Sequence, residues 1–60
     1  MKKITVIDGQ GGKMGRAIVE QLKKQFPQQE ILAVGTNNTA TTAMLKAGAD
    51  YGATGEIGRA

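Results

Sequence analysis

A glycine-rich turn directly after a β-branched run is the feature that most constrains the fold of this 60-residue chain. The run Ile4-Thr5-Val6-Ile7 stops at Asp8-Gly9, and short apolar runs of this kind are typical of buried parallel strands. Residues 13–25 then place apolar side chains at spacings of three and four, which indicates a helix. The sequence therefore predicts a strand over residues 3–8, a tight turn and a helix over residues 13–25.

The expected helix over residues 13–25 carries one apolar stripe and ends before Pro27, because proline disfavours a helical conformation in the residue that precedes it. We expect this stripe to face the rest of the fold. Its members are Met14, Ala17, Ile18, Leu22 and Phe26.

A second strand and helix follow. Residues 30–35 form another short apolar run, and residues 36–39 are a loop that ends in good helix N-cap residues. A helix is predicted over residues 39–47, with Gly48 as the residue that ends it. Residues 50–60 are rich in glycine and small side chains, and we predict an irregular tail there.

These elements predict the α/β class, with a Rossmann-like βαβ(α) unit over residues 1–60, parallel strands and a right-handed crossover. Two parallel strands with this much chain cannot cover both of their faces, and parallel sheets are normally covered on both. The chain is therefore expected to be a fragment of a longer doubly wound sheet, or to complete its core as a homo-oligomer.

The glycine turn suits a phosphate group. Glycines between a first strand and its helix permit a tight turn, a close approach of the backbone to a pyrophosphate and close packing of the helix on the strand. The phosphate then sits on N–H groups at the helix N-terminus. A phosphate loop that also binds magnesium is excluded, because Ile7 and Met14 stand where Gly and Ser or Thr are required. The alternative is a purely structural turn. The predicted cofactor-binding residues of this turn are Gly9, Gln10, Gly11, Gly12, Lys13, Met14 and Gly15.

The end of the second strand would lie near the ribose of a bound nucleotide. Thr36 and Asn37 occupy the place where an acidic residue usually holds the ribose hydroxyls of NAD. Neither an acid nor a base stands there, so NAD and NADP are both possible cofactors and should bind about equally. Asp8 would repel a phosphate unless its charge is offset, and we expect its side chain to bond backbone N–H groups of the turn instead.

Composition narrows the function classes. The chain has no histidine and no cysteine, so no catalytic residue and no metal site can be named from it. The net charge of +3 comes from scattered lysines and arginines, which argues against nucleic-acid binding. No apolar run approaches the length of a membrane span, and we expect a cytoplasmic protein that binds a phosphate-bearing small molecule.

Two family resemblances bear on these expectations. Residues 6–16 resemble the N-terminal segment of dihydrodipicolinate reductase, which implies that Gly9, Gly12 and Gly15 are the cofactor glycines and that Lys13 and Met14 lie beside the pyrophosphate and the adjoining ring. The turn is also similar to that of prephenate dehydrogenase.

Over more of the chain, residues 6–12, 35–37 and 52–56 look like a family of small bacterial proteins of unknown function, whose members are longer. Three functions therefore stay open. They are a nucleotide-binding or dinucleotide-binding module, the cofactor-binding half of an NAD(P)-dependent reductase, and a structural α/β fragment without a ligand.

Overall fold

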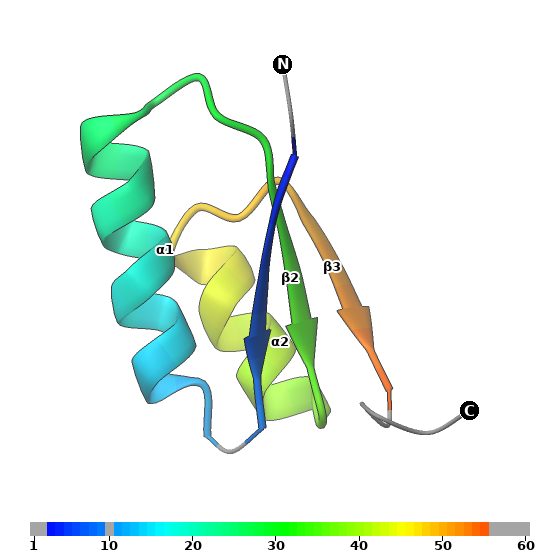
Figure 1. The fold of residues 1–60 in the computed structure, drawn as a ribbon. Coiled ribbons are helices and arrows are strands. Elements are labelled where there is room, and N and C mark those ends of the chain that lie inside the picture. The colour runs from blue at the N-terminus through cyan, green and yellow to red at the C-terminus, as the bar shows by residue number, and fades with distance from the viewer. Residues whose placement is uncertain (1–2, 10, 56–60) are drawn as a thin grey trace.

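The computed structural model describes residues 3–9 and 11–55, and it contains three strands and two helices in that part of the chain (Figure 1). Strands and helices alternate along the sequence, as expected for an α/β chain. In chain order the elements are β1 (Ile4–Asp8), α1 (Lys13–Gln25), β2 (Ile31–Gly35), α2 (Asn38–Lys46) and β3 (Tyr51–Thr54).

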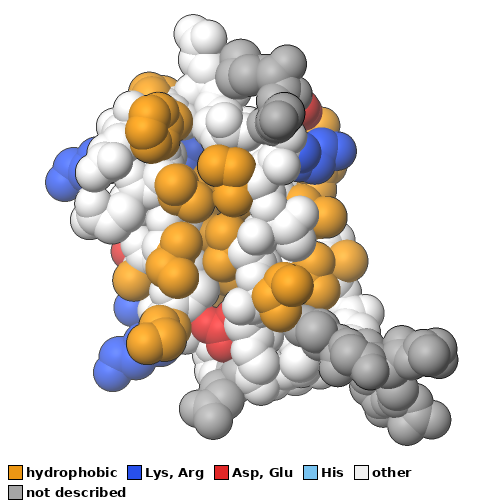
Figure 2. Space-filling model, viewed as in Figure 1, with side chains coloured by type: hydrophobic (Ala, Val, Ile, Leu, Met, Phe, Trp, Pro, Cys, Tyr) orange, Lys and Arg blue, Asp and Glu red, His pale blue; other side chains and the backbone are white. Residues whose placement is uncertain are grey.

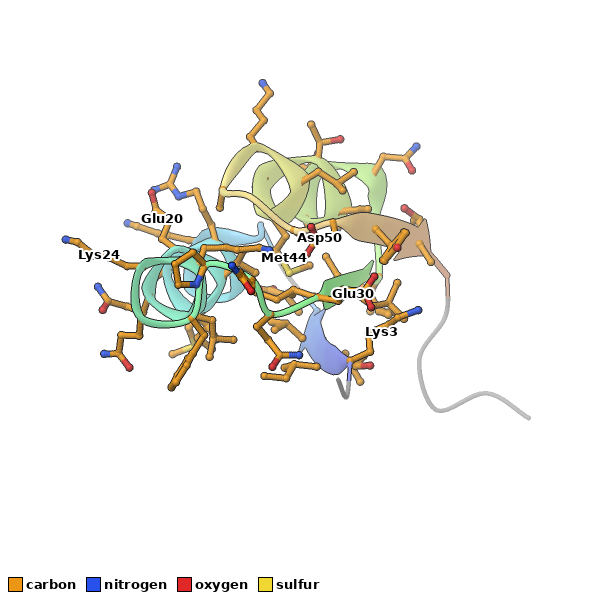
Figure 3. The ribbon with its side chains drawn as sticks, turned by 90° about the horizontal axis from the view of Figure 1, so that it is seen from above. Lys3, Glu20, Lys24, Glu30, Met44 and Asp50 are labelled. Atoms are coloured by element: carbon orange, nitrogen blue, oxygen red, sulfur yellow. The ribbon has the colours of Figure 1, made fainter. Side chains whose placement is uncertain are left out.

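The three strands form one open parallel sheet in the order β1-β2-β3, with Ile4 opposite Ile31 and Leu32 opposite Tyr51. Each connection moves one strand further in the same direction. Right-handed crossovers in one direction place both helices on the same face, and Figure 3 shows α1 and α2 together on one side of the sheet. The predicted α/β class with parallel strands is confirmed.

The prediction of an irregular tail over residues 50–60 is wrong at Tyr51–Thr54, which forms β3. The segment Tyr-Gly-Ala-Thr lacks the β-branched run that marks the other strands, so no sequence signal distinguished it. It forms a strand because the backbone groups on one edge of β2 pair with it, and because Gly52 lets it lie against Leu45 of α2. Residues 56–60 lie outside the described residues.

The core lies between the sheet and the two helices, where Val19 and Met44 pack against the covered face of the strands. Figure 3 places Met44 in this layer. The remaining buried members of the cluster are Val6, Ile31 and Ala33.

The apolar stripe expected to face this core is mostly exposed. The exposed fractions are 78% for Met14, 47% for Ile18 and 55% for Phe26, whereas the buried residues of α1 are Gly15 and Val19. The reason is the position of α1, which packs on the edge strand β1 and on α2. One flank of the helix therefore extends past the edge of the sheet, where the described chain offers nothing to cover it.

The amino ends of the strands are tied together by one lysine and one aspartate. Lys23 Nζ lies 2.7 Å from Asp50 Oδ2, and the same oxygen accepts a hydrogen bond from Ile31 N at 2.9 Å. The hydrogen bond from Lys23 lowers the pKa of Asp50 below its usual value. These contacts join α1 to β2 and to the start of β3, at the end of the sheet opposite the glycine turn. In the described part of the chain, no helix is long and apolar enough to cross a membrane.

Candidate functional site

The glycine turn joins the carboxyl end of β1 to α1, and Gly12 determines its shape. Gly12 is the N-cap of α1 and has a left-handed backbone with φ 84°. A Cβ at this position would lie 2.8 Å from Ala40 Cα and 2.9 Å from Ala43 Cβ of α2. The turn therefore needs glycine here for two reasons: its backbone conformation and its close contact with α2.

Gly15 is needed because α1 crosses close to the end of β1. A Cβ on Gly15 would lie 2.6 Å from Met44 Sδ and 2.8 Å from Asp8 Oδ2. The N–H of Gly15 donates a hydrogen bond of 2.6 Å to Asp8 Oδ2, and Asp8 is only 9% exposed. The expectation that the Asp8 side chain bonds backbone N–H of the turn is confirmed for Gly15.

Gly9 and Gly11 have no such steric reason. A Cβ on Gly11 would meet nothing within 4 Å, and one on Gly9 would make only ordinary contacts of 3.9 Å with the side chain of Thr36. Neither glycine has a left-handed φ. The fold therefore explains the glycine at position 12 and the one at position 15, but it does not explain the one at position 11.

A hollow of about 480 Å³ lies beside this turn, between the outer side of β1 and the first turns of α1. Its apolar wall comes from Ile7, Met14 and Ile18, and its charged residues are Asp8 and Lys13. The turn contributes bare backbone to the same wall. Figure 2 shows how hydrophobic side chains gather over the helix and the strands on this face of the molecule. The glycines that line the hollow are Gly9, Gly11 and Gly15.

The second strand-to-helix turn lies next to the first. Thr36 Oγ1 donates a hydrogen bond of 2.7 Å to Gly9 O, and Thr36 N donates one of 3.1 Å to Asp8 O. Asn37 is the N-cap of α2, and its Oδ1 accepts a hydrogen bond from Ala40 N at 2.8 Å. The polar groups of Thr36 and Asn37 thus bind the chain itself, and their contact with a ribose stays a prediction.

The described residues of the predicted site therefore lie together at the carboxyl end of the parallel strands. Gln10, which was also predicted, lies outside the described residues. Within residues 3–9 and 11–55, no group of three or more acidic, histidine or cysteine side chains could hold a metal ion.

Sequence reasoning did not identify a hydroxyl pair under the second turn. Thr54 Oγ1 lies 2.8 Å from Thr41 Oγ1, and Thr41 Oγ1 lies 3.2 Å from both Ala53 O and Asn37 O. Thr41 is almost fully buried. Only the contact between α2 and β3 brings the two residues together, so no local pattern in the sequence could have found the pair.

Comparisons with known proteins identify the family of this chain but indicate no activity. No curated protein and no solved structure matches the chain significantly. The resemblance to dihydrodipicolinate reductase accordingly receives no support from them. One family model, described as "Domain of unknown function (DUF3842)", matches residues 3–58. This match agrees with the resemblance to a family of small proteins of unknown function. Because the model covers nearly the whole chain, this protein belongs to the family of the domain of unknown function DUF3842.

Proposed function

We propose that this domain binds a phosphate-bearing nucleotide or dinucleotide, with the phosphate on the backbone of the glycine turn. The observation that carries the proposal is Gly11. Its missing side chain is not required by the backbone conformation or by any neighbouring atom, and it lines the hollow. A glycine of this kind is what a ligand that approaches the backbone would need.

The electrostatics of the turn support an anion, with one opposing charge. A helix leaves its first N–H groups without acceptors inside the helix, and it carries about half a positive charge at that end. Gly12 supplies no side-chain cap to α1, and Lys13 adds a cation to the wall of the hollow. Asp8 opposes an anion, but its Oδ2 is turned to the N–H of Gly15. Helix geometry directs the N–H groups of the first two residues, Lys13 and Met14, out of the helix end.

The test is a titration of the chain with inorganic phosphate, ATP, NADH and NADPH, followed by backbone amide shifts. We expect the largest shifts at Gly9, Gly11, Lys13 and Met14. NADH and NADPH should bind within about tenfold of each other, because neither Thr36 nor Asn37 carries a charge.

The variant Gly11→Ala separates binding from folding. Its new methyl group meets no atom of the chain, so the melting temperature should stay unchanged while ligand affinity falls by about tenfold or more. Gly55→Ala is the matched control, because Gly55 is also at the carboxyl edge and a Cβ there also meets nothing within 4 Å. If none of the four ligands binds at millimolar concentration, the turn is structural and the proposal is wrong.

A further inference from the structure

Asp8 places a negative charge at the helix end that the phosphate would occupy. It is the last residue of β1, it is only 9% exposed, and it is one of the residues that line the hollow. Its Oδ2 accepts a hydrogen bond of 2.6 Å from the N–H of Gly15, the third residue of α1. A ligand phosphate on the N–H groups of Lys13 and Met14 would therefore share the first turn of one helix with a buried carboxylate.

Two like charges in such a site repel each other strongly, because a partly buried pair is screened less than a pair in water. Within the described chain, Lys13 is the other charged residue that lines the hollow. Arg16, the next cation of α1, is exposed and does not line it. Where they adjoin Asp8, β2 and α2 contribute the uncharged residues Gly35 and Met44. One lysine thus faces two negative groups, and the ligand itself has to reduce their repulsion.

A phosphate that keeps one proton removes this conflict. Its O–H donates a hydrogen bond to the carboxylate, and a hydrogen bond between O–H and O⁻ is shorter and stronger than one between neutral groups. A carboxylate can accept this bond in addition to the one from Gly15, because its oxygens offer about four acceptor positions. A terminal phosphate takes up its second proton near about pH 6. The pyrophosphate of a dinucleotide and the sulfate ion, in contrast, hold no proton near neutral pH.

We propose that the hollow selects a terminal phosphate group in its singly protonated form, and that Asp8 accepts the hydrogen bond from that proton. This assignment rests on the phosphate site proposed above, and it narrows the ligand from any phosphate-bearing nucleotide to a phosphate monoester. Asp8 then has two roles, because it caps α1 and also discriminates among anions. The fixed carboxylate favours an anion that brings a hydrogen to it and disfavours one that brings only lone pairs.

AMP and NAD are a matched pair of ligands for the test. Both contain an adenosine phosphate, which is terminal in AMP and joined into a pyrophosphate in NAD. Each is titrated into the full chain at about pH 6 and at about pH 8, with EDTA present, and the affinity is measured by calorimetry. At the lower pH we expect AMP to bind about tenfold or more tightly than NAD. The affinity for AMP should fall by about tenfold or more at the higher pH, whereas the affinity for NAD should not change.

Inorganic phosphate and sulfate extend the test to the bare anions. Both are small tetrahedral oxyanions, but only phosphate carries a proton in this pH range. We expect phosphate to bind about tenfold or more tightly than sulfate at the lower pH.

Asp8→Asn tests the residue itself. The variant keeps an oxygen for the N–H of Gly15 and should fold, but it lacks the charge that discriminates. The preference for phosphate over sulfate should therefore fall by about tenfold, and the affinity for AMP should depend less on pH. Asp50→Asn is the matched control, because Asp50 Oδ2 also accepts a hydrogen bond from a backbone N–H, that of Ile31, at the opposite end of the sheet. It should leave all four affinities unchanged.

The outcomes separate this proposal from the phosphate site on which it rests. If no ligand binds at either pH, the site itself is wrong and the role of Asp8 fails with it. If the ligands bind but sulfate equals phosphate, NAD equals AMP at the lower pH, or Asp8→Asn keeps the original preference, only the role of Asp8 is wrong. Binding that appears only when magnesium replaces EDTA would also overturn that role, because a metal ion would then offset the charge.

Discussion

Both strand-to-helix turns of this domain lead into a helix whose N-terminus is capped by a side chain, but the capping residue lies in a different place in each. In each helix the third residue is the one whose N–H is capped: Gly15 in α1 and Ala40 in α2. In α2 the cap is the local N-cap residue Asn37. In α1 it is Asp8, which reaches across from the end of β1, while the local N-cap residue Gly12 has no side chain.

In the first turn the residue that caps the helix is not part of the loop, whereas in the second turn it is. Because Asp8 caps α1 from the strand, the backbone between Gly9 and Gly12 does not need polar side chains to complete the helix end. The β2–α2 turn has its side chains committed to the chain, with Thr36 bound to Gly9 and Asn37 bound to Ala40. A turn with a remote cap can present bare backbone to a ligand, whereas a turn with a local cap presents side chains that are already in use.

Of the variants that test this comparison, Gly15→Val should reduce stability most. The added side chain would overlap Met44 Sδ and the Asp8 carboxylate, and it would push α1 away from both. Overpacking of this kind costs about 1–3 kcal/mol and occasionally more, and we expect about 3 kcal/mol here because the remote cap is lost as well. Urea unfolding monitored by circular dichroism measures the change. Gly11→Ala is the control, and a Gly15→Val variant as stable as that control would show that α1 does not cross close to β1.

Asp8→Ala removes the side chain that caps α1 from the end of β1. It leaves the buried N–H of Gly15 without this acceptor, and an unsatisfied buried donor costs about 1–3 kcal/mol, so we expect a loss near 2 kcal/mol. Asp8→Asn keeps an oxygen acceptor for this N–H and removes the negative charge, and a charge at a helix end is worth about 0.3–1 kcal/mol. Equal losses for the two variants would mean that the hydrogen bond itself contributes little.

Asn37→Ala removes the local cap and should cost about 1 kcal/mol, the usual loss for an N-cap side chain. Its control is Asn38→Ala, the same chemical change one residue later, at an exposed position in the first turn of α2. The difference between these two variants in a urea titration isolates the cap. If Asn37→Ala costs more than Asp8→Ala, the remote cap is the weaker of the two and the comparison reverses.

Much of this fold was readable from the sequence because its signals are local. The β-branched run, the glycine turn and the periodicity of residues 13–25 predicted β1 and α1, and the apolar run over residues 30–35 predicted β2. The close packing of Gly15 was also predictable, because a helix that follows a strand after so short a turn must cross close to the end of that strand.

What the sequence did not reveal depends on contacts between distant segments. β3 forms on a ladder supplied by β2, and the buried Thr41–Thr54 pair exists only after α2 packs on β3. The orientation of α1 was missed for a related reason. A periodic apolar stripe shows that a helix is amphipathic, but it does not say whether the stripe faces its own sheet or extends past the edge, as Met14 and Ile18 do.

The consecutive strand order has a consequence for how such a sheet can grow. A fourth strand added beyond β3 by a right-handed crossover would bring its helix to the face that α1 and α2 already occupy. A fourth strand added beside β1 would reverse the direction of the crossover and bring its helix to the uncovered face. The direction of growth alone therefore decides whether a larger protein built on this unit has one helical layer or two.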